Sequence, residues 1–276
     1  MRMYQRHHIG TRPEGLRGLW SAVLVVLLLF PGFEIAFVSS ATAQQPVSIT
    51  VSAAISLKDA LDDLGQKYEK AHPGTTIRFN FGGSGALQHQ IEQGAPVDVF
   101  FSAAEKQMDD LAAGGLIDSG TRRDIAANNL VLIVPMDSHG VKSFQDLSQP
   151  SVKIVAVGEP TSVPAGLYAQ QSLDHMGLLA PIKSKLVFAK DVRQVLTYVE
   201  TGNADAGLVY TTDANISSKV RVAATAPASS HEPILYPAAV LRGSMNMSVA
   251  RAFLDYTAGR EGRAVFEKFG FTSPEK

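Results

Sequence analysis

The chain has 276 residues, a hydrophobic content of 45% and a formal net charge of −1. It contains no cysteine, which excludes disulfides, thiolate metal sites, cysteine nucleophiles and a lipid-anchored N-terminal cysteine. The near balance of 25 Lys+Arg and 26 Asp+Glu gives no sign of the basic patch that nucleic-acid binding needs.

The first 43 residues have the layout of a secretory signal peptide. Arginines in 1–17 precede an apolar run at 19–30, and Ala41-Thr42-Ala43 forms a small-residue cleavage site. The apolar run is too short for a membrane helix, which needs roughly 20 residues. We therefore expect cleavage near Gln44 and a mature protein in a bacterial periplasm.

The expected mature chain has about 233 residues, enough for one large domain or two small ones. Residues 1–43 hold four basic and two acidic residues, so their removal leaves 21 Lys+Arg, 24 Asp+Glu and a net charge of −3.

Strand-like and helix-like runs alternate through the first half of the mature chain. Buried or alternating apolar patterns predict strands at 47–51, 76–81 and 97–103. Amphipathic patterns predict the helices that follow these strands, at 56–72, 84–93 and 105–115.

The second half continues the same alternation. The patterns predict strands at 130–135, 153–160, 185–190, 206–213, 220–227 and 235–242. They also predict a helical turn at 143–147 and helices at 164–177, 191–202 and 248–269.

The alternation predicts an α/β protein with mainly parallel sheets. We expect two lobes, with crossings near Asn128-Asn129 and near Tyr236-Pro237. The first lobe would contain 44–128 plus 237–276, and the second would contain 129–236.

Four predicted helices begin directly after a strand and a short turn, at Ser56, at Ser84, at Pro164-Ala165-Gly166 and at Asp191-Val192. A helix start carries unpaired N–H groups and a partial positive charge, so it can hold an anion. In open α/β sheets such starts line the crevice at the carboxyl ends of the strands. Several of them facing one cleft would bind an anion without an arginine or lysine.

Each of these features also has a purely structural explanation. Ser56 taken alone is explained as a helix cap, and the glycine turn around Ser84 as a tight bend. Pro164 marks a helix start, where its missing N–H costs nothing. Tyr210, on an apolar strand, is explained as a core tyrosine whose hydroxyl reaches solvent.

Motifs for catalysis fit the sequence less well. The turn Gly82-Gly83-Ser84-Gly85-Ala86 lacks the last glycine of a nucleophile elbow, and no P-loop occurs. The mature histidines show no metal-ligand spacing, and the acid pairs Asp62-Asp63 and Asp109-Asp110 fall on solvent faces of helices. We therefore expect no enzyme activity, catalytic residue or cofactor.

Taken together, the junctions resemble the periplasmic molybdate-binding proteins of ABC transporters. The resemblance runs from about Val47 to the C-terminus. Its markers in chain order are SAAISL (52–57), ALQHQIEQGAPVDVFFSA (86–103), VGEPTSVPAGLYA (157–169), KDVRQVL (190–196), AGLVYTTDA (206–214) and FEKFGF (266–271).

The resemblance implies a type II-like periplasmic binding protein fold, with two α/β lobes joined by two crossing strands and the oxyanion in the cleft. It also implies the ligand contacts, which are Ser56, Ser84, Ala165, Val192 and Tyr210. These residues would contact the metal of the oxyanion only through its oxygens. The serine-rich turn common in that family is replaced here by Gly82-Gly83-Ser84-Gly85, so a hydroxyl contact of some relatives is expected to be missing.

The implied ligand is molybdate or tungstate, and the implied partner is the membrane permease of an ABC transporter. We expect a monomer that binds no nucleic acid. A receptor for sulfate or another tetrahedral oxyanion is the alternative within the same fold. A more distant alternative is an exported serine hydrolase using Ser84 or Ser56, which would need a nearby general base.

Overall fold

A computed structural model describes residues 46–274 of the chain. The expected signal peptide, residues 1–43, lies outside these residues and stays a prediction. Within the described part of the chain, none of the helices combines the length and the apolar character that a membrane crossing requires.

The first of two five-stranded sheets has the strand order β2-β1-β3-β10-β4. Its strands are β1 (Val47–Ala54), β2 (Thr75–Gly82), β3 (Val99–Phe101), β4 (Arg123–Ala127) and β10 (Leu235–Val240). The helices packed on it are α1 (Lys58–Ala71), α2 (Ser84–Glu92), α3 (Glu105–Ala113), α8 (Met247–Ala258) and α9 (Arg260–Lys268). We call this sheet and its helices the first lobe.

The two faces of the first sheet are covered by different helices, as the alternation along its strands requires. Phe100 and Ala239 pack with α2 and α3, in a small core that includes Leu87 and Met108. Their neighbours Phe101 and Ala238 belong to the main core, on the side of α1, α8 and α9. The sheet is thus buried on both faces, which explains its apolar strands.

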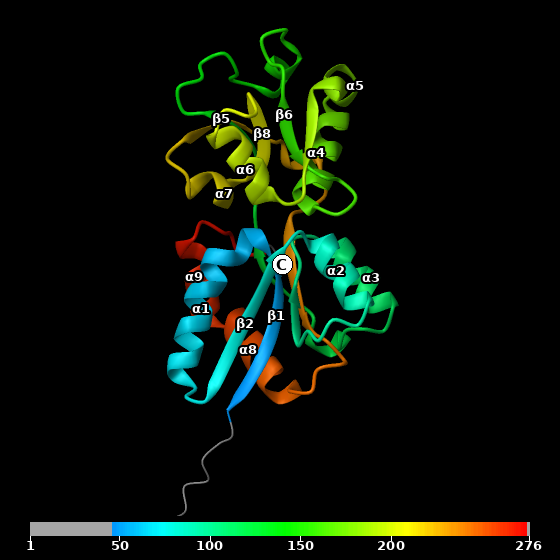
Figure 1. The fold of residues 1–276 in the computed structure, drawn as a ribbon, viewed down its shortest axis with the longest axis vertical. Coiled ribbons are helices and arrows are strands. Elements are labelled where there is room, and N and C mark those ends of the chain that lie inside the picture. The colour runs from blue at the N-terminus through cyan, green and yellow to red at the C-terminus, as the bar shows by residue number, and fades with distance from the viewer. Residues whose placement is uncertain (1–45, 275–276) are drawn as a thin grey trace, which may run out of the picture. The chain divides into compact units, whose positions relative to one another are not determined.

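The second sheet has the strand order β7-β6-β8-β5-β9. Its strands are β5 (Leu130–Pro135), β6 (Val155–Gly158), β7 (Leu186–Ala189), β8 (Ala206–Tyr210) and β9 (Val220–Thr225). Helices α4 (Pro164–His175), α5 (Leu179–Ile182), α6 (Val192–Glu200) and α7 (Thr211–Asn215) belong with it (Figure 1). We call this sheet and its helices the second lobe.

Short 3-10 helices complete the described structure. They are η1 (Ile55–Leu57), η2 (Ser119–Thr121), η3 (Phe144–Ser148), η4 (Lys183–Lys185) and η5 (Ala228–Ser230). Of these, η1 is important for function, because it carries Ser56 between β1 and α1.

Both sheets are mixed, whereas mainly parallel sheets were expected. In the first sheet β1, β2 and β3 are parallel, while β10 is antiparallel to β3 and β4. In the second, β6 is parallel to β7 and β8, while β5 is antiparallel to β8 and β9. The antiparallel strands β5 and β10 are those that the chain enters from the other lobe. They therefore do not need the crossover helix that connects parallel neighbours.

The two crossings between the lobes run side by side. The first is Asn128-Asn129, between β4 and β5, and the second is residues 226–234, between β9 and β10. A hydrogen bond of 3.1 Å from the Asn128 N–H to the Ile234 carbonyl joins them. Tyr236, where the second crossing was expected, already pairs with Ala126 of β4 in the first sheet.

Several local expectations differ from the structure, and three of the differences are the largest. Strand β4 was not predicted, the expected strand 206–213 ends at Tyr210, and the expected helix 248–269 is divided at Gly259. Gly259 has an extended backbone, with φ −79° and ψ −169°, which ends α8 and begins α9.

Candidate functional site

The carboxyl ends of six parallel strands meet at one pocket between the lobes. Strands β1, β2 and β3 end beside it in the first lobe, and β6, β7 and β8 end beside it in the second. The pocket is lined by Ala54, Ile55, Ser56, Gly82, Gly83, Ser84, Ala103, Val163, Pro164, Ala165, Val192 and Tyr210. All five residues expected to contact a ligand are therefore brought together.

The pocket is small and has no charged residue in its lining. Its volume is about 10 Å³, about enough for a single water molecule. Pockets for organic ligands occupy roughly 300–1,000 Å³. The pocket is therefore far too small for an organic ligand of ordinary size.

Ser84 is the first residue of α2, and its side chain is fixed from behind. Its Oγ accepts a hydrogen bond of 3.0 Å from the Ala103 N–H, which follows β3. A serine hydroxyl has one hydrogen to donate. Since the oxygen of Ser84 already accepts, its hydrogen is available to a ligand.

Ser56 occupies the corresponding position after β1, in the buried helix η1. Its Oγ lies 3.3 Å from the hydroxyl of Tyr236, which comes from β10. The two serines therefore stand at the ends of neighbouring parallel strands, each in contact with a second polar group of the first lobe.

Ala165 and Val192 supply main-chain N–H groups from the second lobe. They lie in the first turns of α4 and α6, where N–H groups have no intrahelical acceptor. A side chain at Gly166 would approach the Gly158 carbonyl oxygen to 2.1 Å, so the glycine lets the start of α4 lie directly on β6. Asp191 caps α6 by accepting a 2.8 Å hydrogen bond from the Gln194 N–H.

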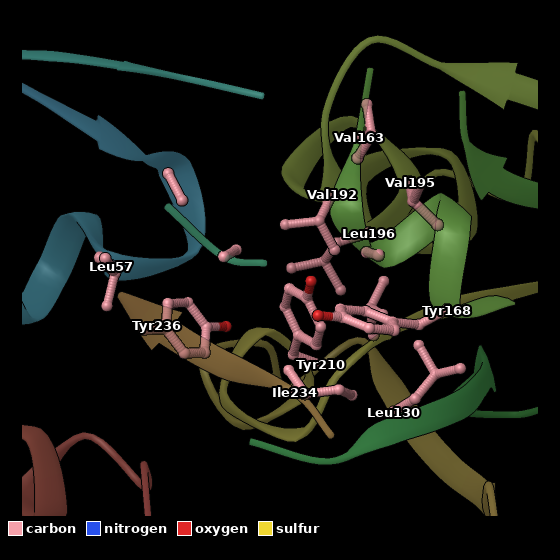
Figure 2. Packing of buried hydrophobic residues seen from close by; sticks show 14 of the residues in the cluster. Leu57, Leu130, Val163, Tyr168, Val192, Val195, Leu196, Tyr210, Ile234 and Tyr236 are labelled. Atoms are coloured by element: carbon pink, nitrogen blue, oxygen red, sulfur yellow. The ribbon is translucent and has the colours of Figure 1, made fainter. Parts of the chain in front are cut away.

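Tyr210 ends β8 and is almost fully buried, with 1% exposure. Its hydroxyl oxygen has no hydrogen-bond partner among the described residues. Burial, followed by the nearby Tyr236, raises the pKa of Tyr210 well above its ordinary value, so the phenol keeps its hydrogen at neutral pH. A buried donor without an acceptor is costly, and Tyr210 is one of the residues that line the pocket. Figure 2 shows its ring beside those of Tyr168 and Tyr236.

The glycine turn at 82–85 contacts the opposite lobe as well as the pocket. The Gly85 N–H donates a 2.9 Å hydrogen bond to the Ser162 carbonyl. A Cβ at Gly85 would lie 2.7 Å from the Ser162 Cα, and one at Gly83 would lie 3.0 Å from the Lys190 carbonyl oxygen. The glycines are therefore required by the approach of the second lobe, a reason that the sequence did not reveal.

A second contact between the lobes is made by Arg193, which follows Val192. Its guanidinium binds Asp213 in the second lobe at 2.6 Å and Asp59 on α1 in the first lobe at 2.8 Å. Burial raises the pKa of the fully buried Asp213 to about 6, although Arg193 opposes the shift. Burial in turn lowers the pKa of Arg193, but the two carboxylates raise it on balance.

Three residues near the site were not predicted. Ala103 fixes Ser84, and its place at the end of the expected strand 97–103 could have identified it. Tyr236 and Asn128 lie behind Ser56, and their hydroxyl oxygen and side-chain Nδ2 are 3.2 Å apart. Tyr236 contacts Ser56 and Asn128 across 180 and 108 positions of sequence, so a local pattern could not identify either Tyr236 or Asn128. Within residues 46–274, no group of three His, Cys, Asp or Glu residues is placed to hold a metal ion.

Residues 49–272 match the family of bacterial extracellular solute-binding proteins. The chain belongs to this family. The type II-like binding-protein architecture and the recognition of a solute-binding protein, both expected from the sequence, are thereby confirmed.

This solute-binding protein is similar in sequence and in structure to binding proteins of ABC transporters. It is 44% identical to YvgL of Bacillus subtilis, a candidate ABC transporter substrate-binding lipoprotein, over 92% of this chain and 97% of that one. It is 37% identical to the molybdate-binding protein ModA of Escherichia coli, over 89% and 97%. The structure of the periplasmic molybdate-binding protein of Azotobacter vinelandii matches with a TM-score of 0.74 and 28% identity, over 82% and 100%.

The family also decides between binding and catalysis. Its members are solute-binding proteins, which confirms that this chain is not an enzyme. The residues that line the pocket include no histidine and no carboxylate. Neither Ser56 nor Ser84 has a lining residue that could act as the general base of a hydrolase.

Proposed function

We propose that this solute-binding protein captures molybdate in the pocket and delivers it to the permease of an ABC transporter. The observation that carries the proposal is the buried Tyr210 hydroxyl, which lacks an acceptor in the wall of a pocket shared by both lobes. The similarity to molybdate-binding relatives supports the same ligand. Ser56, Ser84, Ala165, Val192 and Tyr210 are the proposed contacts.

The chemistry of the donors suits a tetrahedral dianion. Molybdate, tungstate and sulfate offer only acceptors when fully deprotonated, and the proposed contacts offer O–H and N–H donors. Hydrogen bonds to a charged group contribute roughly 1.5–3 kcal/mol each. Tungstate has nearly the size of molybdate, and we propose that it binds as well. Sulfate is smaller and would not reach all donors at once.

The location and the oligomeric state of the protein are part of the proposed function. We propose export by the signal peptide 1–43, cleavage near Gln44 and a monomer in the periplasm. We also propose the expected division of the lobes at Asn128-Asn129, with 237–276 returning to the first lobe. Because Leu235 and Tyr236 pair with β4, we assign them to the first lobe as well.

A thermal-shift screen of the mature protein tests the ligand class. A ligand at about 1,000 times its dissociation constant stabilises the folded state by about 4 kcal/mol, which for a chain of this size raises Tm by on the order of 10 °C. We expect this rise with molybdate and tungstate and a much smaller one with sulfate, phosphate or chromate. Equal stabilisation by sulfate would reject the molybdate assignment, and no response to any oxyanion would reject the function.

Replacing Tyr210 by phenylalanine tests the observation itself. Tyr210→Phe keeps the ring and removes the hydroxyl, so molybdate affinity should fall by about 10–100-fold, the value of one hydrogen bond to a charged group. The unliganded protein should be as stable as before or more stable, because a buried donor without a partner has been removed. Calorimetric titration and urea unfolding measure the two effects, with Tyr256→Phe on α8 as the matched control. An unchanged affinity would contradict the role of Tyr210.

A further inference from the structure

A triad of charged side chains stands beside the pocket without lining it. Each member comes one to three positions after a residue that does line the pocket, so each pair belongs to one strand-to-helix junction. The pairs are Val192 with Arg193, Tyr210 with Asp213, and Ser56 with Asp59. The triad therefore joins three of the segments that supply the proposed ligand contacts.

The two contacts of Arg193 differ in what they join. Arg193 and Asp213 both belong to the second lobe, so their 2.6 Å contact does not depend on how the lobes are placed. The 2.8 Å contact from the Arg193 Nη2 to the Asp59 Oδ2 joins α6 to α1 of the first lobe. Opening of the lobes about their two crossings would separate these helices. The bond to Asp59 is therefore available only while the lobes are closed.

Asp213 holds the guanidinium of Arg193 in the orientation that Asp59 needs. It is fully buried and accepts from the Arg193 Nε, which leaves the Nη2 to face the first lobe. The side chain of Arg193 is itself only 19% exposed. A planar guanidinium that is already fixed loses little side-chain entropy when it forms a second bond. The bond to Asp59 should therefore favour closure more than a pair of two mobile surface side chains would.

We propose that Arg193 and Asp59 form a latch between the lobes, which holds the pocket closed around its ligand without touching that ligand. This inference rests on the proposed function. Both are positioning residues, because neither lines the pocket. The latch forms after the ligand has entered, so it slows dissociation and leaves the association rate nearly unchanged. Most differences in affinity among variants of one binding site arise in the dissociation rate.

Other roles of Asp59 give different expectations. If its charge acted only at long range, removing this negative charge near a site for an anion should strengthen binding. The latch requires weaker binding after the same removal. A role in folding alone would lower the stability of the unliganded protein and leave the dissociation rate as it is. The sign of the change in affinity, and the rate in which it appears, therefore separate the three roles.

Asp59→Ala, compared with Asp62→Ala, tests the proposal. Both aspartates lie on α1, their side chains are 40% and 36% exposed, and each variant loses one negative charge. Asp62 pairs with Lys58 of the same helix, so its contact does not join the lobes. Calorimetric titration with molybdate measures the affinity. Release of radiolabelled molybdate into an excess of unlabelled molybdate measures the dissociation rate, and the two values together give the association rate.

We expect Asp59→Ala to weaken molybdate binding about fivefold through a dissociation about fivefold faster, the upper end of what exposed ion pairs contribute. Asp62→Ala should stay within about twofold of the wild type in both quantities. Urea unfolding of the unliganded protein should change by similar small amounts in the two variants. Binding by Asp59→Ala as tight as that by Asp62→Ala, or an unchanged dissociation rate, would overturn the latch alone. A wild-type protein that binds no oxyanion would overturn the proposed function and this inference with it.

Discussion

Gly85→Ala is expected to weaken molybdate binding by on the order of 100-fold, or about 2.7 kcal/mol. The new Cβ would lie 2.7 Å from the Ser162 Cα and 2.8 Å from its carbonyl oxygen. These are main-chain atoms of the second lobe, so they cannot move aside as a flexible side chain would. The lobes would close incompletely, and the contacts from Ala165, Val192 and Tyr210 would weaken together.

Stability and affinity should change in opposite directions in this variant. Gly85 lies inside α2, where alanine is favoured over glycine by roughly 0.5–1 kcal/mol. Calorimetric titration and urea unfolding of the unliganded protein therefore separate failed closure from misfolding. Gly243→Ala is the matched control, because a Cβ there meets no atom within 4 Å. An affinity of Gly85→Ala within twofold of wild type would show that closure does not depend on this contact.

Arg193→Met should lower the free energy of unfolding by roughly 3–5 kcal/mol near neutral pH, the usual cost of breaking a buried ion pair from one side. Asp213 is fully buried, and its Oδ2 already lacks a partner among the described residues. Loss of the 2.6 Å contact from the Arg193 Nε would leave the buried carboxylate without its charged partner.

The loss should be smaller at about pH 5 than at about pH 7, as the linkage between protonation and folding requires. Burial raises the pKa of Asp213 to about 6, above its ordinary value of 3.8. Between these two values the folded protein binds more protons than the unfolded one, so this group destabilises the fold as pH rises. Arg193 opposes this rise, so its loss raises the pKa of Asp213 further. Protonation of Asp213 in mild acid therefore restores more stability to the variant than to the wild type.

Urea unfolding at both pH values measures this effect. Asp59→Asn is the control, because Asp59 is the more exposed partner of Arg193. The side chain of Asp59 is 40% exposed. Such a pair contributes only about 0–1 kcal/mol. Equal losses for Arg193→Met at both pH values, or a loss as small as that of Asp59→Asn, would contradict the account of Asp213.

Local pattern was sufficient to predict the parts of the site that follow a strand directly. Ser56, Ser84 and Val192 each lie at the start of a helical segment that follows a parallel strand, Ser56 as the second residue of η1. The carboxyl ends of such strands meet at one edge. Ala165 begins α4 after the loop that follows β6, and Tyr210 is the last residue of its strand. The family resemblance added which of the many junction residues to choose.

The parts that were missed depend on contacts between distant segments. Strand β4 begins with the exposed Arg123 and Asp124, so no apolar alternation marks it. Strands β5 and β10 run antiparallel because of how the crossings enter the sheets, which no local pattern records. The glycine turn around Ser84, taken alone, was explained as a tight bend, but Gly85 has a neighbour in Ser162 of the other lobe. Tyr236 contacts Ser56 across 180 positions of sequence.

The most direct test is a crystal structure of the mature protein grown with molybdate, with the metal located by its anomalous scattering. The account predicts one strong peak in the pocket, with oxygens within hydrogen-bonding distance of Ser56, Ser84, Tyr210 and the N–H groups of Ala165 and Val192. A peak at another place on the protein, or an empty pocket in crystals saturated with molybdate, would contradict it.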